Sequence, residues 1–257
     1  EQYKMGKKVA RVIAVCNEKG GVGKTTTVCN LSAGLRRKGY KTLMIDLDSQ
    51  LSLSKSLYAV NEEKSIVPVM AKLTPIQEVI QVVAQGDIIS GRRTINVIDL
   101  VLNEADKQFA LKEALHPIIT DYDFILLDCP PSLSTITLNA LVCASEVIIP
   151  TEAKTLALEG VQEVLSTIGV IKERYNPELK IAGILITRYN GRAILSQDVR
   201  TVLEQMAAEV GTKVFKHPIR NNQAIADSQA YLTDIFAYSK RSNGAEDYGR
   251  LVDEIIG

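Results

Sequence analysis

Short apolar runs of strand length alternate with longer segments of helical periodicity along the whole chain. The short runs are continuously apolar, which is typical of strands buried on both faces of a parallel sheet. We therefore predict a single-domain, doubly wound α/β fold, with a mostly parallel sheet and helices on both faces. The expected strands cover residues 12–16, 42–46, 95–99, 124–128, 146–150 and 181–187.

Helix signals fill the segments between these strands. A helix is predicted over residues 24–38, because Gly39 is a favourable residue just past a helix end. Thr74 and Pro75 predict the N-cap and the first position of another helix. Residues 51–93 otherwise lack a strong strand, and we expect short helices and loops there, over the edge of the sheet.

Two later segments carry apolar residues at helical spacing, which predicts helices that bury one face. The spaced positions are Val161, Val164, Leu165, Ile168 and Ile171 in the first segment, and Tyr248, Leu251, Val252 and Ile255 in the second. Between these two segments, a further helix is expected over residues 194–209.

Length and composition fit one large domain. No linker, low-complexity tract or internal repeat divides the 257 residues, so we expect an N-terminal extension over residues 1–8 and one domain over residues 9–257. Lysine plus arginine and aspartate plus glutamate each number 30, and any binding of nucleic acid therefore has to come from a local patch. No apolar run approaches the roughly 20 residues that span a bilayer, and no signal-peptide pattern opens the chain. A soluble cytoplasmic protein is the resulting expectation.

The cysteines are scattered, with no C-x-x-C pair and no histidine close in sequence. We expect buried thiols in a reducing compartment, which argues against an iron–sulfur protein. The four are Cys16, Cys29, Cys129 and Cys143.

A glycine-rich loop lies between the first predicted strand and the first predicted helix. Glycines let successive backbone N–H groups turn toward one point, and the following helix directs its positive end there. Phosphate is the expected occupant, with Lys24 at the β- and γ-phosphates and the Thr25 hydroxyl on Mg²⁺. The consensus G-x-x-x-x-G-K-S/T fails at its first glycine, where Glu18 stands. After Glu18 the loop reads Lys19, Gly20, Gly21, Val22, Gly23, Lys24, Thr25, Thr26.

This loop resembles the deviant Walker A motif of the ParA/MinD family of P-loop ATPases, and within it the ParA/Soj-type DNA-partitioning ATPases. Lys19 is the mark of the variant. The resemblance implies that Lys19 crosses a dimer interface to the phosphates of a second subunit, and that ATP or ADP with Mg²⁺ is bound by the loop. A plain glycine turn with solvated lysines is the alternative.

The apolar run that ends in Asp128 looks like a Walker B strand, with Asp128 as the carboxylate that holds the metal. A strand ending in aspartate is common, so the interpretation depends on the phosphate loop in the same chain. Cys129, Pro130 and Pro131 follow, and with Asp128 they resemble the D-x-P-P switch II of ParA proteins, in which two prolines stiffen the loop beneath the γ-phosphate.

Asp46 and Asp48 end the second predicted strand and share one face of an extended segment. The segment resembles the D-x-D-P-Q switch I of the family, which implies that Asp46 lies near Mg²⁺ and that Asp48 polarises the attacking water. Ser49 stands where proline is usual and predicts a looser loop. A solvated acidic turn is the alternative interpretation.

The resemblance covers most of the chain, with residues 51–93 as the main exception. Near the end, Pro218, Arg220 and Asn221 lie in a segment similar to the one that closes over the base in ParA proteins. The resemblance implies that Asn221 and the neighbouring backbone contact adenine. In isolation, this stretch is only a loop signal.

Basic residues recur in the last third and would form a sequence-independent phosphate-binding stripe if they shared one face of a dimer. ParA relatives bind non-specific DNA as ATP-held dimers, so the resemblance implies a homodimer associated with the nucleoid. Ordinary solvated surface charges are the alternative. The candidates are Arg188, Arg192, Arg200, Lys216, Arg220, Lys240 and Arg241.

Three functions stay open. The first is a DNA-partitioning ATPase with weak intrinsic activity, in which an ATP-bound sandwich dimer binds DNA until a ParB-like partner stimulates hydrolysis and release. The second is a MinD-like membrane-associated ATPase, which is disfavoured because the last predicted helix carries no cluster of lysine or arginine. The third is a ParA-like positioner of non-DNA cargo. With its first strand this early, the chain is expected to lack the N-terminal helix-turn-helix of longer plasmid members.

Overall fold

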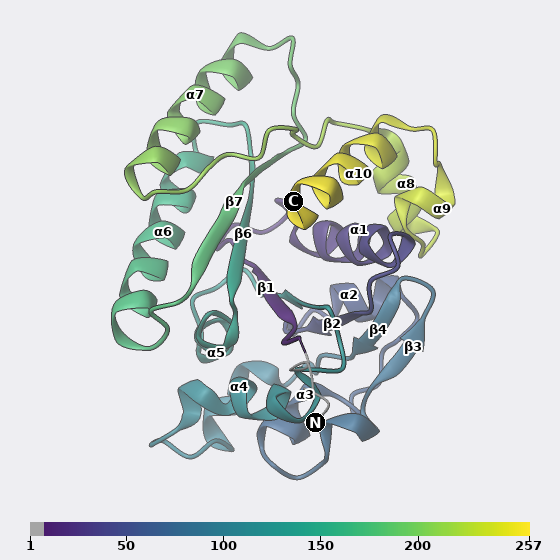
Figure 1. The fold of residues 1–257 in the computed structure, drawn as a ribbon, viewed down its shortest axis with the longest axis vertical. Helices are drawn as coiled ribbons and strands as arrows, with labels where there is room; N and C mark the ends of the chain where they lie inside the picture. The colour runs from purple at the N-terminus through teal and green to yellow at the C-terminus, as the bar shows by residue number, and fades with distance from the viewer. Residues whose placement is uncertain (1–7) are drawn as a thin grey trace, which may run out of the picture.

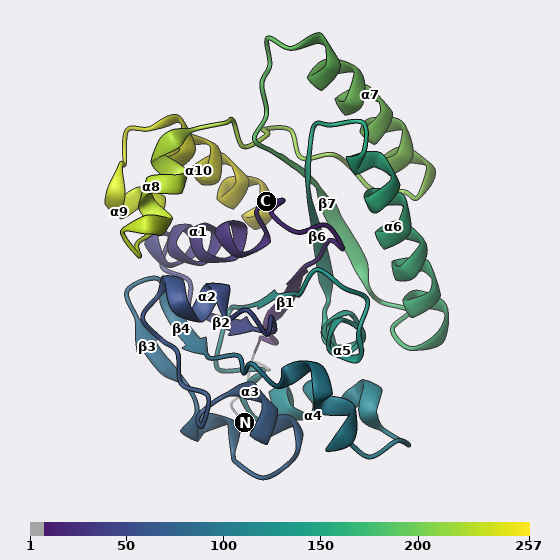
Figure 2. The ribbon, with the colours of Figure 1, turned by 180° about the vertical axis from the view of Figure 1, so that it is seen from behind.

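The structure is a computed structural model, and it describes residues 8–257. These residues form a seven-stranded sheet in the order β3-β4-β2-β5-β1-β6-β7, with helices on both sides (Figures 1 and 2). Neighbouring strands are parallel, except that β3 runs antiparallel to β4. The predicted doubly wound α/β fold is therefore confirmed. Residues 1–7 of the expected extension lie outside the described residues.

The strands are short and lie near the expected positions in five cases. They are β1 (Arg11–Val15), β2 (Thr42–Asp46), β3 (Gln81–Val83), β4 (Gly86–Ile89), β5 (Phe124–Asp128), β6 (Glu146–Glu152) and β7 (Lys180–Thr187).

The α-helices are α1 (Lys24–Arg37), α2 (Ser52–Ser56), α3 (Ile66–Met70), α4 (Ala110–Leu115), α5 (Thr135–Cys143), α6 (Ala157–Arg174), α7 (Ile194–Glu209), α8 (Gln223–Ala230), α9 (Ile235–Tyr238) and α10 (Asn243–Ile256). Short 3-10 turns are η1 (Ile76–Glu78), η2 (Ile95–Leu100), η3 (Lys107–Phe109) and η4 (His116–Ile118).

Alternate residues of each central strand enter two separate cores. In β1, Ile13 and Val15 pack with residues of α1 and α10, whereas Val12 and Ala14 pack with residues of α5 and α6. All four side chains are almost completely buried. This burial on both faces is the physical reason that the strands read as continuous apolar runs.

Helices α1 and α10 pack closely against each other over one face of the sheet (Figure 1). A Cβ on Gly34 of α1 would lie only 2.5 Å from Cγ2 of Val252, so the close approach depends on glycine. The predicted apolar stripe of α10 is buried here, as the stripe of α6 is on the other face. Each large apolar side chain contributes about 1.5–3 kcal/mol by this burial.

One predicted strand is wrong. Residues 95–99 belong to the 3-10 turn η2, because the buried residues Ile95 and Ile98 are three positions apart while their neighbours are exposed. The strand beside β2 is instead β4, which lies within residues 51–93, where we expected no strong strand. The short edge strand β3 completes a hairpin with β4.

Two further expectations change in detail. Thr74 and Pro75 precede only the single 3-10 turn η1, with Pro75 itself in the cap position instead of the first helical position. The first helix ends at Arg37 and is followed by Gly39 with a φ of +91°, as its sequence suggested.

The four cysteines are free thiols. Among residues 8–257, no helix combines the length and apolar composition needed to cross a membrane.

Candidate nucleotide-binding site

The candidate site lies where the parallel strands β1, β2 and β5 end. The glycine-rich loop follows β1, Asp46 ends β2 and Asp128 ends β5. Strand pairing brings these ends together, because β5 lies between β1 and β2. The connection from β1 runs through α1 to β2 on one side of β1, whereas the connection from β5 runs through α5 to β6 on its other side. Such a reversal of strand order is the usual position of a ligand site in a doubly wound fold.

The loop takes a shape that only glycine adopts easily. Gly21 and Gly23 have φ values of +76° and +91°, and Gly23 is the residue before α1. No side chain caps the start of α1, and its first turn carries no acidic residue. The Val22 carbonyl accepts a 2.9 Å hydrogen bond from Thr187 Oγ1, which fastens the loop to the end of β7. The helix thus directs free N–H groups at the loop, as an anion site requires.

Lys24 is folded into this loop. Its Nζ donates to the backbone carbonyls of Asn17 and Lys19, both at 2.9 Å, and the residue is only 7% exposed. Burial lowers the pKa of Lys24 below its usual range, although the nearby Asp128 partly opposes the shift. Lys19 is half-buried. A phosphate that replaced the two carbonyls would supply Lys24 with a charged hydrogen-bond acceptor in place of neutral ones.

Thr25 and Asp128 form a polar pair at the end of β5. Thr25 Oγ1 donates to Asp128 Oδ2 at 2.7 Å, whereas Asp128 Oδ1 is buried without a hydrogen-bond partner. Burial, and then the charge of Asp46 beside it, raise the pKa of Asp128 well above its usual range. A buried carboxylate oxygen without a donor is costly on its own and suits a cation next to the threonine hydroxyl. The residues therefore fit Mg²⁺.

The two carboxylates of the predicted switch I differ in their surroundings. Asp46 Oδ2 accepts from the backbone N–H and the hydroxyl of Ser54 at 2.8 and 2.6 Å, and Asp46 Oδ1 accepts from the N–H of Asp48 at 3.1 Å. Burial raises the pKa of Asp46 to about 6. Asp48 is half-buried and lines the groove beside Lys24. Of the two, Asp48 is the one that lines the hollow at the glycine loop.

Ser49 gives the switch I loop a contact that proline could not make. Its Oγ accepts a 3.1 Å hydrogen bond from Asn96 Nδ2 on η2.

Within residues 8–257, no group of three or more histidine, cysteine, aspartate or glutamate side chains could hold a metal by itself. A Mg²⁺ ion at Thr25 and Asp128 would therefore complete its shell with water and phosphate oxygens, as Mg²⁺ commonly does.

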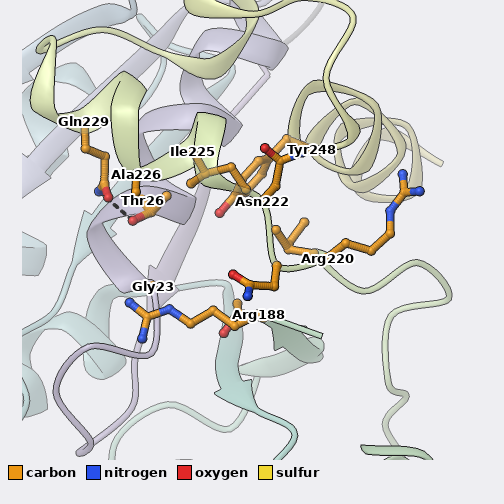
Figure 3. A pocket seen from close by; sticks show the side chains of 12 residues that line it. Gly23, Thr26, Arg188, Arg220, Asn222, Ile225, Ala226, Gln229 and Tyr248 are labelled. Carbon is orange, nitrogen blue, oxygen red and sulfur yellow. Dashed lines mark hydrogen bonds between the residues drawn. The ribbon is translucent and has the colours of Figure 1, made fainter. Parts of the chain in front are cut away.

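Two hollows join into one groove at the phosphate loop. Both are lined by Gly23, Thr26, Arg188 and Gln229. The wider hollow also takes in Lys24, Thr25 and Asp48, and the second has a cavity volume of about 100 Å³. Figure 3 shows the second hollow, where Ile225 and Tyr248 lie on the far side from Gly23. A polar end beside an apolar end matches a phosphate chain and a base.

The three residues predicted to close over a base differ in whether they line this second hollow. Asn221 and Arg220 line it, and Pro218 does not. In Figure 3 the Arg220 side chain points away from Gly23. Its guanidinium donates to Asp247 Oδ1 and Glu246 Oε2, both at 2.6 Å, and these contacts raise the pKa of Arg220. This segment therefore offers a ligand its backbone, Ile219 and the two asparagines Asn221 and Asn222, while the Arg220 guanidinium is engaged elsewhere.

Sequence reasoning missed several residues of the groove, among them Thr187, Ile225, Gln229 and Tyr248. Gln229 Nε2 donates to Thr26 Oγ1 at 2.6 Å across 203 positions of sequence (Figure 3). Thr187 could have been found, because it ends β7 at the same edge as the other site residues. No local pattern marks the other three, since α8 and α10 reach the groove only through the folded arrangement.

The structure separates the seven basic residues into different settings. Arg188 lines the groove, Arg200 pairs with Glu204 at 2.8 Å, and Arg220 is held by α10. In the part of the chain that the structure describes, one hydrogen bond joins two of the seven, from Arg200 Nη2 to the Lys216 carbonyl at 3.3 Å. Among the described residues, four of the seven make no side-chain ion pair: Arg192, Lys216, Lys240 and Arg241.

Comparisons with known proteins place the chain among nucleotide-binding proteins. The model of a family described as "AAA domain" matches residues 10–181. The chromosome-partitioning ATPase Soj of Thermus thermophilus is 37% identical, over 96% of this chain and 95% of the relative. The chromosome partitioning protein ParA of Myxococcus xanthus is 34% identical, over 96% of this chain and 88% of the relative.

A solved structure also covers nearly the whole chain. It is described as cobyrinic acid a,c-diamide synthase from Mycobacterium smegmatis with bound ATP analog and magnesium. It is 32% identical to this chain, covers 96% of this chain and 94% of its own, and superposes with a TM-score of 0.84.

Proposed function

Because the chain belongs to the ParA and Soj family of chromosome-partitioning ATPases, we propose that it is a Mg²⁺-dependent ATP hydrolase that partitions DNA. The observation that supports this most directly is the convergence of Lys24, Thr25 and Asp48 on one groove, with Asp128 hydrogen-bonded to Thr25 behind it. Lys24 and Thr25 begin α1 after the glycine loop, whereas Asp48 follows β2 and Asp128 ends β5. Phosphoryl transfer needs positioned charges of this kind.

Each residue has a role that follows from its setting. Lys24 leaves the carbonyls of Asn17 and Lys19 and donates to the β- and γ-phosphate oxygens. Thr25 and Asp128 hold Mg²⁺, which neutralises charge on the phosphates when bound. Asp48, beside the phosphate end of the groove, orients the attacking water and accepts its proton. Asp46 holds the start of α2, and its predicted place near Mg²⁺ stays a prediction.

We further propose that the ATP-bound form is a homodimer in which Lys19 reaches the phosphates of the partner. Lys19 is half-buried on the loop itself, and its backbone N–H donates to Asn17 Oδ1 at 2.9 Å, which fixes where the side chain starts. The dimer would bind non-specific DNA, and a ParB-like partner would stimulate hydrolysis and release. The names of the relatives support this role.

A membrane-bound positioning ATPase fits the structure less well. The apolar residues of α10 are buried against α1 and the sheet, so this helix has no free apolar face for a lipid surface. A positioner of non-DNA cargo would use the same groove. The similar solved structure is named as a diamide synthase, so similarity of fold alone does not decide between these functions.

A salt series of DNA binding would test the proposal. Binding to random-sequence duplex DNA is measured with ATP and Mg²⁺, with ADP and Mg²⁺, and without nucleotide. We expect binding with ATP only, falling steeply as salt rises, because phosphate contacts release counterions. ATP hydrolysis without DNA binding in any state would leave the ATPase assignment and overturn the DNA role. Failure to bind ATP would overturn both.

A further inference from the structure

Arg188 lies where the two hollows of the groove meet. It follows Thr187, whose hydroxyl holds the loop carbonyl of Val22, and it lines both hollows together with Gly23. Figure 3 shows its side chain running toward the Gly23 side of the hollow. The backbone of Arg188 has a φ of +49°, which is uncommon for a residue with a side chain. This turn aims the arginine along the groove at the junction of its polar and apolar ends.

The guanidinium of Arg188 is held by one buried carboxylate. Arg188 Nη1 donates to Glu152 Oε1 at 2.8 Å, and Lys154 Nζ lies 2.5 Å from the other carboxylate oxygen. The Glu152 side chain is only 7% exposed, whereas that of Arg188 is 62% exposed. Burial alone would raise the pKa of Glu152, but the two cations outweigh it and lower the pKa. Two cations, Lys154 and Arg188, therefore pair with the single carboxylate of Glu152.

We propose that Arg188 is a ligand for the phosphate chain of the bound nucleotide, and that Glu152 holds it at the groove until nucleotide arrives. The inference rests on the proposed nucleotide binding and adds a residue that the sequence had suggested for DNA. The exchange leaves Glu152 paired with Lys154, so no buried carboxylate loses its only counter-charge. The mostly exposed arginine is free to turn, and its planar fork suits phosphate oxygens.

The position of Arg188 within the groove favours contact with the phosphates over contact with the base. Arg188 shares both hollows with Gly23 and Thr26, which begin the helix that points at the phosphates. The residues that surround the apolar end are Ile219, Ile225 and Tyr248. An arginine at the junction therefore meets the phosphate nearest the sugar before it meets the base.

The test is a ligand series measured by calorimetry on Arg188→Met, which keeps an unbranched apolar stem and removes the charge. Affinities for ATP, ADP and adenosine are compared with those of the unaltered protein in Mg²⁺ buffer. We expect ATP and ADP to bind about five- to tenfold more weakly, because one partly exposed charge-assisted contact is lost, and adenosine to bind equally well. Arg174→Met, at the exposed end of α6, is the matched control and should change none of the three.

A second variant tests the holding role of Glu152. Glu152→Gln removes the competing charge, so ADP should bind about two- to threefold more tightly, with thermal unfolding measured alongside. Weaker or unchanged ADP binding in Glu152→Gln would overturn the exchange. Equal loss of adenosine and ADP affinity in Arg188→Met, or no loss at all, would overturn the phosphate contact. If the unaltered protein bound no nucleotide, the proposed function itself would fail.

Discussion

Charged side chains occupy two contrasting settings in this molecule. At the carboxyl edge of the sheet, Lys24, Asp46 and Asp128 are buried, and each has a pKa displaced from its usual range. Over the last third of the chain, the basic residues are mostly exposed and several are already paired on the surface. Burial makes a charge costly unless a ligand or ion balances it, whereas exposure to water makes it cheap.

The difference indicates where the protein depends on a ligand. Among residues 8–257, Asp128 Oδ1 has no hydrogen-bond partner and Lys24 Nζ donates to two backbone carbonyls, so we expect a cation and an anion from outside to complete the buried edge. The basic surface needs no such completion. We therefore expect single substitutions at the edge to have large effects and single substitutions on the basic surface to have small ones.

The largest effect is expected from Lys24→Ala. It removes the amine that would meet the phosphates, and with it about 3 kcal/mol of charge-assisted hydrogen bonding, or roughly 100-fold in ATP affinity. The substitution also leaves the carbonyls of Asn17 and Lys19 without their donor, so some loss of stability is expected. Calorimetric titration with ATP measures the first effect and thermal unfolding the second. ATP affinity within threefold of normal would contradict the role of Lys24.

Asp48→Ala should separate binding from hydrolysis. Asp48 lines the groove, and its Oδ1 accepts only the N–H of Gln50 among the described residues, so its removal disturbs little structure. Loss of a group that orients and deprotonates water typically costs 10²- to 10⁴-fold, and we expect kcat to fall by about that range. ATP binding and ATP-dependent dimerisation should persist, as seen by light scattering. Normal turnover in this variant would refute the assigned role.

The contrast also explains what the sequence could reveal about the fold. Strands buried on both faces leave continuous apolar runs, and five strands are found where these runs predicted them. The strand β4 was missed because Gly86 and Asp87 interrupt its apolar character and it is only four residues long. Residues 95–99 were misassigned because Ile95, Val97 and Ile98 suggest a strand, while burial at a spacing of three is visible only in the folded chain.

The same distinction holds within the groove. Its phosphate end is formed by one contiguous loop and by carboxylates at strand ends, and both leave a local pattern in sequence. Its apolar end is assembled from β7, α8 and α10, whose residues Thr187, Ile225 and Tyr248 follow no shared motif. Whether an arginine is paired or free is likewise settled by residues far away in sequence, as Arg220 and Asp247 show.

The smallest expected effect is on DNA binding, where Arg192 and Arg220 make a matched pair. Arg192 makes no ion pair among residues 8–257, so Arg192→Ala should weaken binding of any DNA sequence about two- to fivefold. The logarithm of DNA affinity should also fall less steeply with the logarithm of salt concentration, by the amount that about one phosphate contact contributes. Arg220 is already committed to Asp247, which is 2% exposed. Arg220→Ala should therefore mainly lower the free energy of unfolding, by about 1–3 kcal/mol after allowance for the exposed arginine. Filter binding with ATP and urea denaturation measure the two effects. If Arg220→Ala lowered DNA affinity more than Arg192→Ala at equal stability, surface pairing would not decide which basic residues contact DNA.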